Sequence, residues 1–313
     1  MLTENLLKKI GYDDAEIAFI LENNKKYFPL ISPIVEEYLG QLSPKPYVIY
    51  PEGERHLSLK RAEAFVGKVQ KNVPQENPFV MNLLAWLNCV PYLYDIYQKF
   101  GLRDDVFYES MKDFLYKTRE CKLVHGVCGV FVEWFFLLFE LKEFGLGRLQ
   151  YEVYPFEYDR YECDGYHLKK DDMVYSCHIP SSGKLTRELC MESFQMAYEF
   201  FKKDLKGDVI PIITHTWLLY KPYIEKVYPE GSNLKTFASL FEILDNNKDE
   251  SFYDAWRVFH KFYQGTTERL PADNTLRRNF IQYMNDGGDF GEGYGIILYD
   301  GKQKKIINDK GRL

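Results

Sequence analysis

The sequence has few of the features that mark a metal centre, a disulfide scaffold or a membrane protein. It contains six cysteines, but none forms a C-x-x-C pair and none lies at zinc-ligand spacing from a histidine. We therefore expect free thiols in a reducing compartment and no bound metal. The most apolar run, residues 127–141, includes Glu133 and Glu140 and is too short to span a bilayer comfortably, so it predicts a buried helix.

Positively charged side chains are outnumbered by negatively charged ones. The chain has 40 Lys and Arg against 46 Asp and Glu, and its only basic cluster is residues 302–305. Such a chain is a poor candidate for binding nucleic acid. Residues 1–4 pass directly into a polar amphipathic pattern, which argues against a signal peptide. We expect a cytoplasmic protein that binds neither nucleic acid nor membranes, and these features leave its oligomeric state open.

Both common glycine-rich nucleotide motifs are missing, because the chain has neither G-x-x-x-x-G-K-[ST] nor G-x-G-x-x-G. In their place, residues 173–219 predict a strand, a polar loop, a helix and a second strand. The loop is residues 180–186, with the sequence P-S-S-G-K-L-T. A strand that leads through such a loop into a helix offers backbone N–H groups and the positive end of the helix dipole to a phosphate.

An ordinary strand-to-helix turn is the alternative interpretation of this loop. Thr186 would cap the helix, Gly183 would adopt an unusual φ, and Lys184 would be solvated. On the strength of the motif alone we favour this alternative, because short Ser/Thr/Gly loops commonly cap helices.

Apolar residues at helical spacing dominate the first half of the chain, and the pattern changes at Gly145. Residues 148–154 then alternate with period two, while Asp164-Gly165 and Asp300-Gly301 mark hairpins. The remaining expected elements are a helical run at 79–100 interrupted by Pro91, helices at 223–227, 234–240 and 275–284, and a strand at 255–262. We predict an α+β protein, with a helical domain at residues 1–120 and a sheet domain at residues 121–313.

Two histidines and one glutamate are candidate catalytic residues. His178 ends the strand before the loop and His215 lies near the end of the strand after the helix, so adjacent strands would bring both rings to one cleft. Either imidazole could remove a proton near neutral pH, or could equally be a structural histidine bonded to backbone. Glu152 ends an earlier strand, and a solvated edge carboxylate is the favoured interpretation for it.

Four sequence blocks resemble a bacterial family of acyltransferases, in which a helical N-acyltransferase N-terminal domain precedes a GNAT-like C-terminal domain. The blocks are FGLGRLQYE at 144–152, HIPSSG at 178–183, HTWLL at 215–219 and LPADNTLRR at 270–278. The resemblance covers nearly the whole chain. It implies a mixed sheet in which a central strand leads into a pyrophosphate-binding loop and the next strand diverges to admit the acyl-CoA arm.

The resemblance further implies acyl-CoA, either acetyl-CoA or a similar thioester, as co-substrate. Its pyrophosphate would be held by the loop formed by Ser181, Ser182, Gly183, Lys184, Leu185 and Thr186. This loop departs from the superfamily's usual Q/R-x-x-G-x-G/A, and its Ser, Thr and Lys side chains would partly replace the missing glycine amides.

A short acyl group would pass to the amine of a small molecule or peptide, with His178, His215 or Glu152 as base. The rival hypothesis is a non-enzymatic module that binds a nucleotide-like ligand or a peptide on the same fold.

Overall fold

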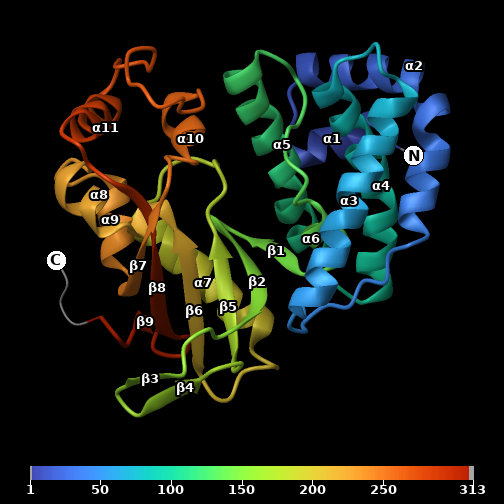
Figure 1. Cartoon of the computed structure of the whole chain (residues 1–313). Helices are drawn as coiled ribbons and strands as arrows, with labels where there is room; N and C mark the ends of the chain where they lie inside the picture. Colours follow the sequence, from blue (N-terminus) through green and yellow to red (C-terminus); the bar gives the residue numbers. More distant parts are fainter. Residues whose placement is uncertain (1, 310–313) are drawn as a thin grey trace. The chain divides into compact units, whose positions relative to one another are not determined.

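The computed structural model describes residues 2–309, which form two compact units that divide between Leu146 and Gly147 (Figure 1). The sequence pattern predicts this division after residue 120. It lies later because residues 121–125 complete a helix of the first unit and residues 135–139 belong to its aromatic core.

The first unit is helical, as predicted. Its elements are α1 (Glu4–Ile10), α2 (Asp14–Leu39), α3 (Glu52–Asn72), α4 (Pro78–Lys99), α5 (Asp104–His125), α6 (Phe136–Phe139) and the strand β1 (Glu143–Leu146). Aromatic rings fill its core: Phe114 stacks on Phe135 at 4.2 Å between centroids, and Trp86 stacks on Phe139 at 5.5 Å. This packing accounts for much of the unit's aromatic content.

Residues 127–141 do not form the predicted buried helix. Gly126 ends α5 in the left-handed conformation, and only Phe136–Phe139 is helical in the run that follows. A Cβ on Gly129 would lie 2.5 Å from the backbone of Phe79, so the chain passes too close to α4 for a side chain there. The run is apolar because much of it is buried, and burial alone does not distinguish a helix from irregular backbone.

The second unit is built on a mixed sheet. Its elements are β2 (Leu149–Pro155), β3 (Arg160–Cys163), β4 (Tyr166–Lys169), β5 (Met173–His178), α7 (Arg187–Phe201), β6 (Val209–Thr216), the 3₁₀-helix η1 (Trp217–Leu219), α8 (Lys221–Lys226), α9 (Asn233–Ser239), β7 (Glu242–Asp249), α10 (Ala255–Phe259), α11 (Thr275–Asn285), β8 (Phe290–Asp300) and β9 (Lys305–Ile306). The strand order runs β2-β5-β6-β8-β7, and β9 pairs with β8. Strands β5 and β6 are parallel, whereas the pairs β2–β5, β6–β8 and β7–β8 are antiparallel.

The predicted strand, loop, helix and strand at 173–219 are confirmed, with the two strands as parallel neighbours. Within this segment one detail differs, because residues 217–219 form the 3₁₀-helix η1 rather than the end of β6. Elsewhere, residues 255–259 form helix α10 rather than a strand, and α4 continues through Pro91, where the sequence pattern predicts an interruption. Helix α7 packs on one face of the sheet, where Phe201 contacts Tyr175 at 4.4 Å and Phe194 contacts Tyr299 at 5.9 Å between ring centroids.

Candidate active site

Strands β5 and β6 pair over a short length and then part. Their register joins Tyr175 to Ile212 and Ser176 to Ile213, although β5 continues to His178 and β6 to Thr216. One residue further along, the Thr214 hydroxyl donates a hydrogen bond of 2.9 Å to the carbonyl of Cys177. A side chain therefore joins the strands just past the last backbone pair, and the residues of β5 and β6 beyond it are not paired with each other.

The three predicted catalytic residues lie on one face of the sheet. Ser176 is in register with both Glu152 and Ile213, and side chains alternate between faces along a strand. His178 and His215, each two residues beyond these positions, therefore share the face of Glu152. Helix α7 covers the opposite face, to which Tyr175 points.

His178 forms a pair with Glu152. Its Nε2 lies 3.3 Å from Glu152 Oε2, across the antiparallel pairing of β2 and β5. The side chain of Glu152 is 1% exposed, whereas that of His178 is 37% exposed. Glu152 is thus a buried carboxylate facing an accessible imidazole, and not the solvated edge charge favoured from the sequence.

His215 has a different carboxylate partner, Glu292 on β8, whose Oε2 lies 3.3 Å from His215 Nε2. Burial raises the pKa of Glu292; the nearby His215 acts in the opposite direction, and Asp254 and Asp249 raise it further. Sequence analysis missed Glu292. The available signal was the alternation Gly-Glu-Gly-Tyr-Gly at 291–295, which places Glu292 and Tyr294 on the face opposite the glycines.

The loop between β5 and α7 has all the features of a helix-capping turn. Thr186 accepts a hydrogen bond from the N–H of Leu189, Gly183 has φ +116°, and Lys184 is exposed. The Glu188 carboxylate also lies at the helix start, where hydrogen bonds from its own N–H and then from the Thr186 hydroxyl lower its pKa. An anion bound here must share the helix N-terminus with this carboxylate.

Two other features of the loop were not foreseen. The Ser182 hydroxyl oxygen is buried and has no hydrogen-bond partner in the part of the chain that the structure describes. The side chain of Arg148, which immediately precedes β2, reaches the loop and donates to three of its carbonyl groups. Nothing in the local sequence links Arg148 to a loop more than 30 residues away.

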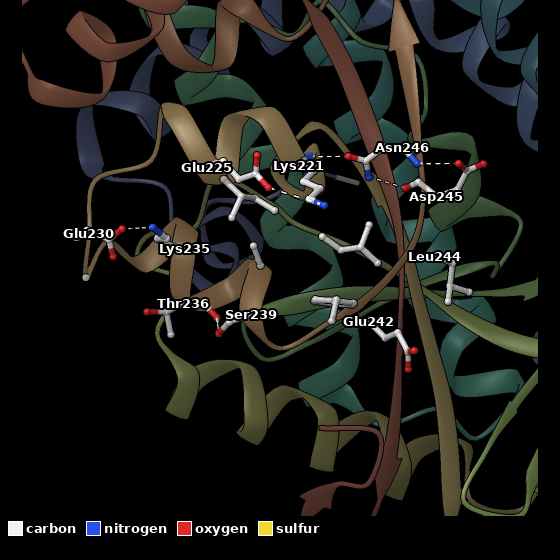
Figure 2. Close-up of a pocket in the computed structure, with 15 residues that line it drawn as sticks. Lys221, Glu225, Glu230, Lys235, Thr236, Ser239, Glu242, Leu244, Asp245 and Asn246 are labelled. Atoms are coloured by element: carbon white, nitrogen blue, oxygen red, sulfur yellow. Dashed lines mark hydrogen bonds and ion pairs between the residues drawn. The ribbon is translucent and has the colours of Figure 1, made fainter. Parts of the chain in front are cut away.

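A separate hollow of about 920 Å³ lies beside β7, α8 and α9 (Figure 2). Lys221 and Glu225 form an ion pair at its rim, with 3.8 Å between Nζ and Oε1, and Lys235 pairs with Glu230. The Asn246 side chain accepts from the N–H of Lys221 at 2.6 Å and so caps α8 from the neighbouring strand. None of the predicted site residues lines this hollow.

Residues 2–309 contain no cluster of metal ligands, and neither Cys177 nor Cys190 has a lowered pKa. No group of three or more His, Cys, Asp or Glu side chains there is placed to hold a metal ion. All six cysteines are free, and burial raises the pKa of Cys190 to about 11 and that of Cys177 further, which makes both poor nucleophiles. Within the same residues, no helix is both long and apolar enough to cross a membrane.

Solved structures of acyltransferases share this fold. One, in complex with decanoyl-CoA and teicoplanin, is 17% identical, with a TM-score of 0.59 over 95% of this chain and 99% of that chain. A second, with CoA and 10C-teicoplanin, is 16% identical at the same TM-score and coverage. A third, with decanoyl-CoA, is 17% identical with a TM-score of 0.56. No curated protein sequence matches the chain significantly.

Two family descriptions match consecutive parts of the sequence. Residues 2–141 match the N-acyltransferase N-terminal domain, and residues 144–297 match the GNAT-like C-terminal domain. The α+β class and the order of a helical region before a mixed sheet are those expected from the sequence. The chain therefore belongs to the family that joins an N-acyltransferase N-terminal domain to a GNAT-like C-terminal domain.

Proposed function

We propose that the protein is an acyl-CoA-dependent N-acyltransferase. The observation that carries the proposal is the short parallel pairing of β5 and β6 beside a loop at a helix N-terminus, with His178, which is paired with Glu152, at the end of the strand that leads into the loop. Similarly folded acyltransferases bind CoA and decanoyl-CoA, which supports this co-substrate. The acceptor is an amine on a small molecule or a peptide; in one of those structures the additional bound molecule is teicoplanin.

In this proposal the loop residues 181–186 hold the pyrophosphate through backbone N–H groups and the dipole of α7. His178 takes a proton from the acceptor's ammonium group, and Glu152 orients the ring and stabilises its charged form. The free amine forms a bond to the thioester carbonyl carbon, the carbon–sulfur bond breaks, and the second proton that the nitrogen loses as the amide forms is taken up by the released thiolate. We place His178 ahead of His215 as the base because its partner carboxylate is the more deeply buried.

A second candidate function is a binding module without catalysis. The loop has a single glycine, and the carboxylate of Glu188 already lies at the helix start. These two observations favour a ligand less charged than CoA, such as a peptide.

The test has two stages. CoA at a hundred times its dissociation constant should stabilise the folded protein by about 2.7 kcal/mol, measured as a rise in Tm. Acyl-CoA from acetyl to decanoyl is then incubated with a panel of amines and short peptides, and thiol release and product mass are measured. We expect acyl transfer to at least one amine, with short acyl groups as the first choice. Stabilisation by CoA without any product would favour the binding module, and no stabilisation would exclude this co-substrate.

A further inference from the structure

The guanidinium group of Arg148 is the main contact that shapes the loop between β5 and α7. Its Nε donates to the carbonyl of Lys184 at 3.0 Å, Nη1 to that of Pro180 at 2.9 Å, and Nη2 to that of Gly183 at 2.9 Å. The planar, rigid arrangement of donors in arginine makes three simultaneous bonds of this length possible. These bonds fix the direction of three peptide groups of the loop.

The direction of the carbonyls determines where the N–H groups point. In a trans peptide the N–H of the next residue points opposite to the carbonyl, and no described peptide bond is cis. The N–H groups of Lys184 and Leu185 therefore point away from Arg148. Neither N–H group has a hydrogen-bond partner in the part of the chain that the structure describes, whereas the N–H of Ser182 donates to the carbonyl of Pro180 at 2.8 Å.

The loop also has room for a ligand on its outer side. A Cβ added to Gly183 would meet no atom within 4 Å, and Lys184 is exposed. The two unpartnered N–H groups therefore lie close to the first turn of α7 and to the open space beside Gly183. The guanidinium group of Arg148 lies on the carbonyl side of the same peptide groups. Unpartnered backbone N–H groups at a helix start are suited to an anion.

We propose that Arg148 is a positioning residue for the diphosphate group of acyl-CoA. By drawing the carbonyls of Pro180, Gly183 and Lys184 to one side, it aims the N–H groups that follow them at the anion and places a positive charge next to the loop. This assignment rests on the proposed function, and it explains how a loop with one glycine can present its backbone to a phosphate.

The test compares two ligands that differ in the diphosphate. The parent, Arg148→Ala and Arg148→Lys are titrated with CoA and with pantetheine, which carries the same thiol arm without the nucleotide and its phosphates. We expect both variants to bind CoA about 10- to 100-fold more weakly, from the loss of charge-assisted hydrogen bonds. Lysine keeps the charge but cannot reach three carbonyls at once, so it should not restore affinity. Pantetheine affinity should change by less than about twofold.

Arg187→Ala is the matched control. It removes one positive charge from the start of α7, where Arg187 pairs with Asp309 at 3.3 Å and no hydrogen bond from its guanidinium to a loop carbonyl is present in the described structure. We expect a loss of CoA affinity of about two- to fivefold at most. Unchanged CoA affinity in both Arg148 variants, or an equal loss for CoA and pantetheine, would overturn the assignment of Arg148 alone. A parent protein that does not bind CoA would overturn the proposed function as well. If the alanine variant does not fold, Arg148→Lys still tests the assignment.

Discussion

A histidine that acts as a general base has to be accessible to its substrate and held in one orientation. His178 meets both conditions, because a third of its side chain is exposed and its Nε2 lies 3.3 Å from the buried Glu152. His215 is also accessible, but its partner Glu292 is 33% exposed, and burial raises the pKa of that carboxyl so that it carries less negative charge near acidic pH. The geometry therefore strengthens the preference for His178, which the sequence favours only slightly through its position beside the loop.

Replacing His178 with glutamine should remove the pH dependence of acyl transfer. At subsaturating acyl-CoA and amine, the parent's rate should rise with pH as the imidazole loses its proton, in the range between about pH 5 and 8. The variant should lose this rise and about 10²–10⁴-fold of kcat/KM, the usual contribution of a general base. The measurement is the pH–rate profile together with the Tm of each protein.

His215→Gln is the matched control for this prediction and should keep the rise with pH. If the two profiles exchange roles, the base is His215. If His178→Gln lowers the Tm but leaves the turnover of folded protein nearly unchanged, His178 is structural.

The candidate site residues could be selected from the sequence, but their pairing could not. His178 and Glu152 are 26 positions apart, and they meet only because β2 and β5 are antiparallel with Gln150 opposite His178. The partner of His215 is Glu292 on β8, which is adjacent to β6 in the sheet but far from it along the chain. Period-two patterns identify the face of a strand but not its neighbour, so Glu292 and Arg148 had no local signal strong enough to select them.

Three alternate glycines determine how the segment after β6 packs on the sheet. Gly291, Gly293 and Gly295 in β8 point to the same face, and Cβ atoms there would lie 2.1–2.4 Å from neighbouring atoms. For Gly293 the neighbour is the backbone of η1, at 2.2 Å from the carbonyl oxygen of Leu219. The segment η1 can therefore pack directly on β8 after β6 ends, because the glycines of β8 have no side chains on that face.

Substituting Gly293 with alanine should destabilise the protein. The new methyl group would clash with backbone rather than with a flexible side chain, so we expect a loss of about 1–3 kcal/mol, measured by urea unfolding. Gly67→Ala is the control, since Gly67 lies inside α3 and a Cβ there meets nothing within 4 Å. That change should stabilise its helix by about 0.5–1 kcal/mol. A Gly293 variant as stable as the parent would mean that η1 shifts without cost.

Elements with a clear period were predictable, and those without one were not. Helix α7 has apolar residues on one stripe and a threonine cap, and both features appear in the structure. Strand β7 was missed because its second half, D-N-N-K-D, is polar and has low strand propensity; it pairs with β8 as the last strand of the sheet, where polar residues are tolerated. Residues 255–262 have apolar side chains at the alternate positions 256, 258 and 262, but tertiary packing of Phe252 and Phe259 around Phe280 favours a short helix.

The second unit offers two separate places for a ligand. One is the loop between β5 and α7, and the other is the hollow beside β7. Strands β6 and β8 lie between β5 and β7 in the sheet, so two strands separate the strand that precedes the loop from the strand beside the hollow. None of the predicted site residues lines the hollow.

Hydrogen exchange measured on the whole chain should distinguish these two places. With CoA at a hundred times its dissociation constant, about 1% of the protein is free, so amides bonded to the ligand should exchange up to about 100-fold more slowly. We expect this slowing at Lys184, Leu185 and the first turn of α7, whose N–H groups lack backbone partners in the described structure. Peptides covering residues 221–246, which line the hollow, should exchange at the rate seen without ligand. Slowing confined to residues 221–246 would move the CoA site to the hollow, and the assignments of the loop and of Arg148 would then be wrong.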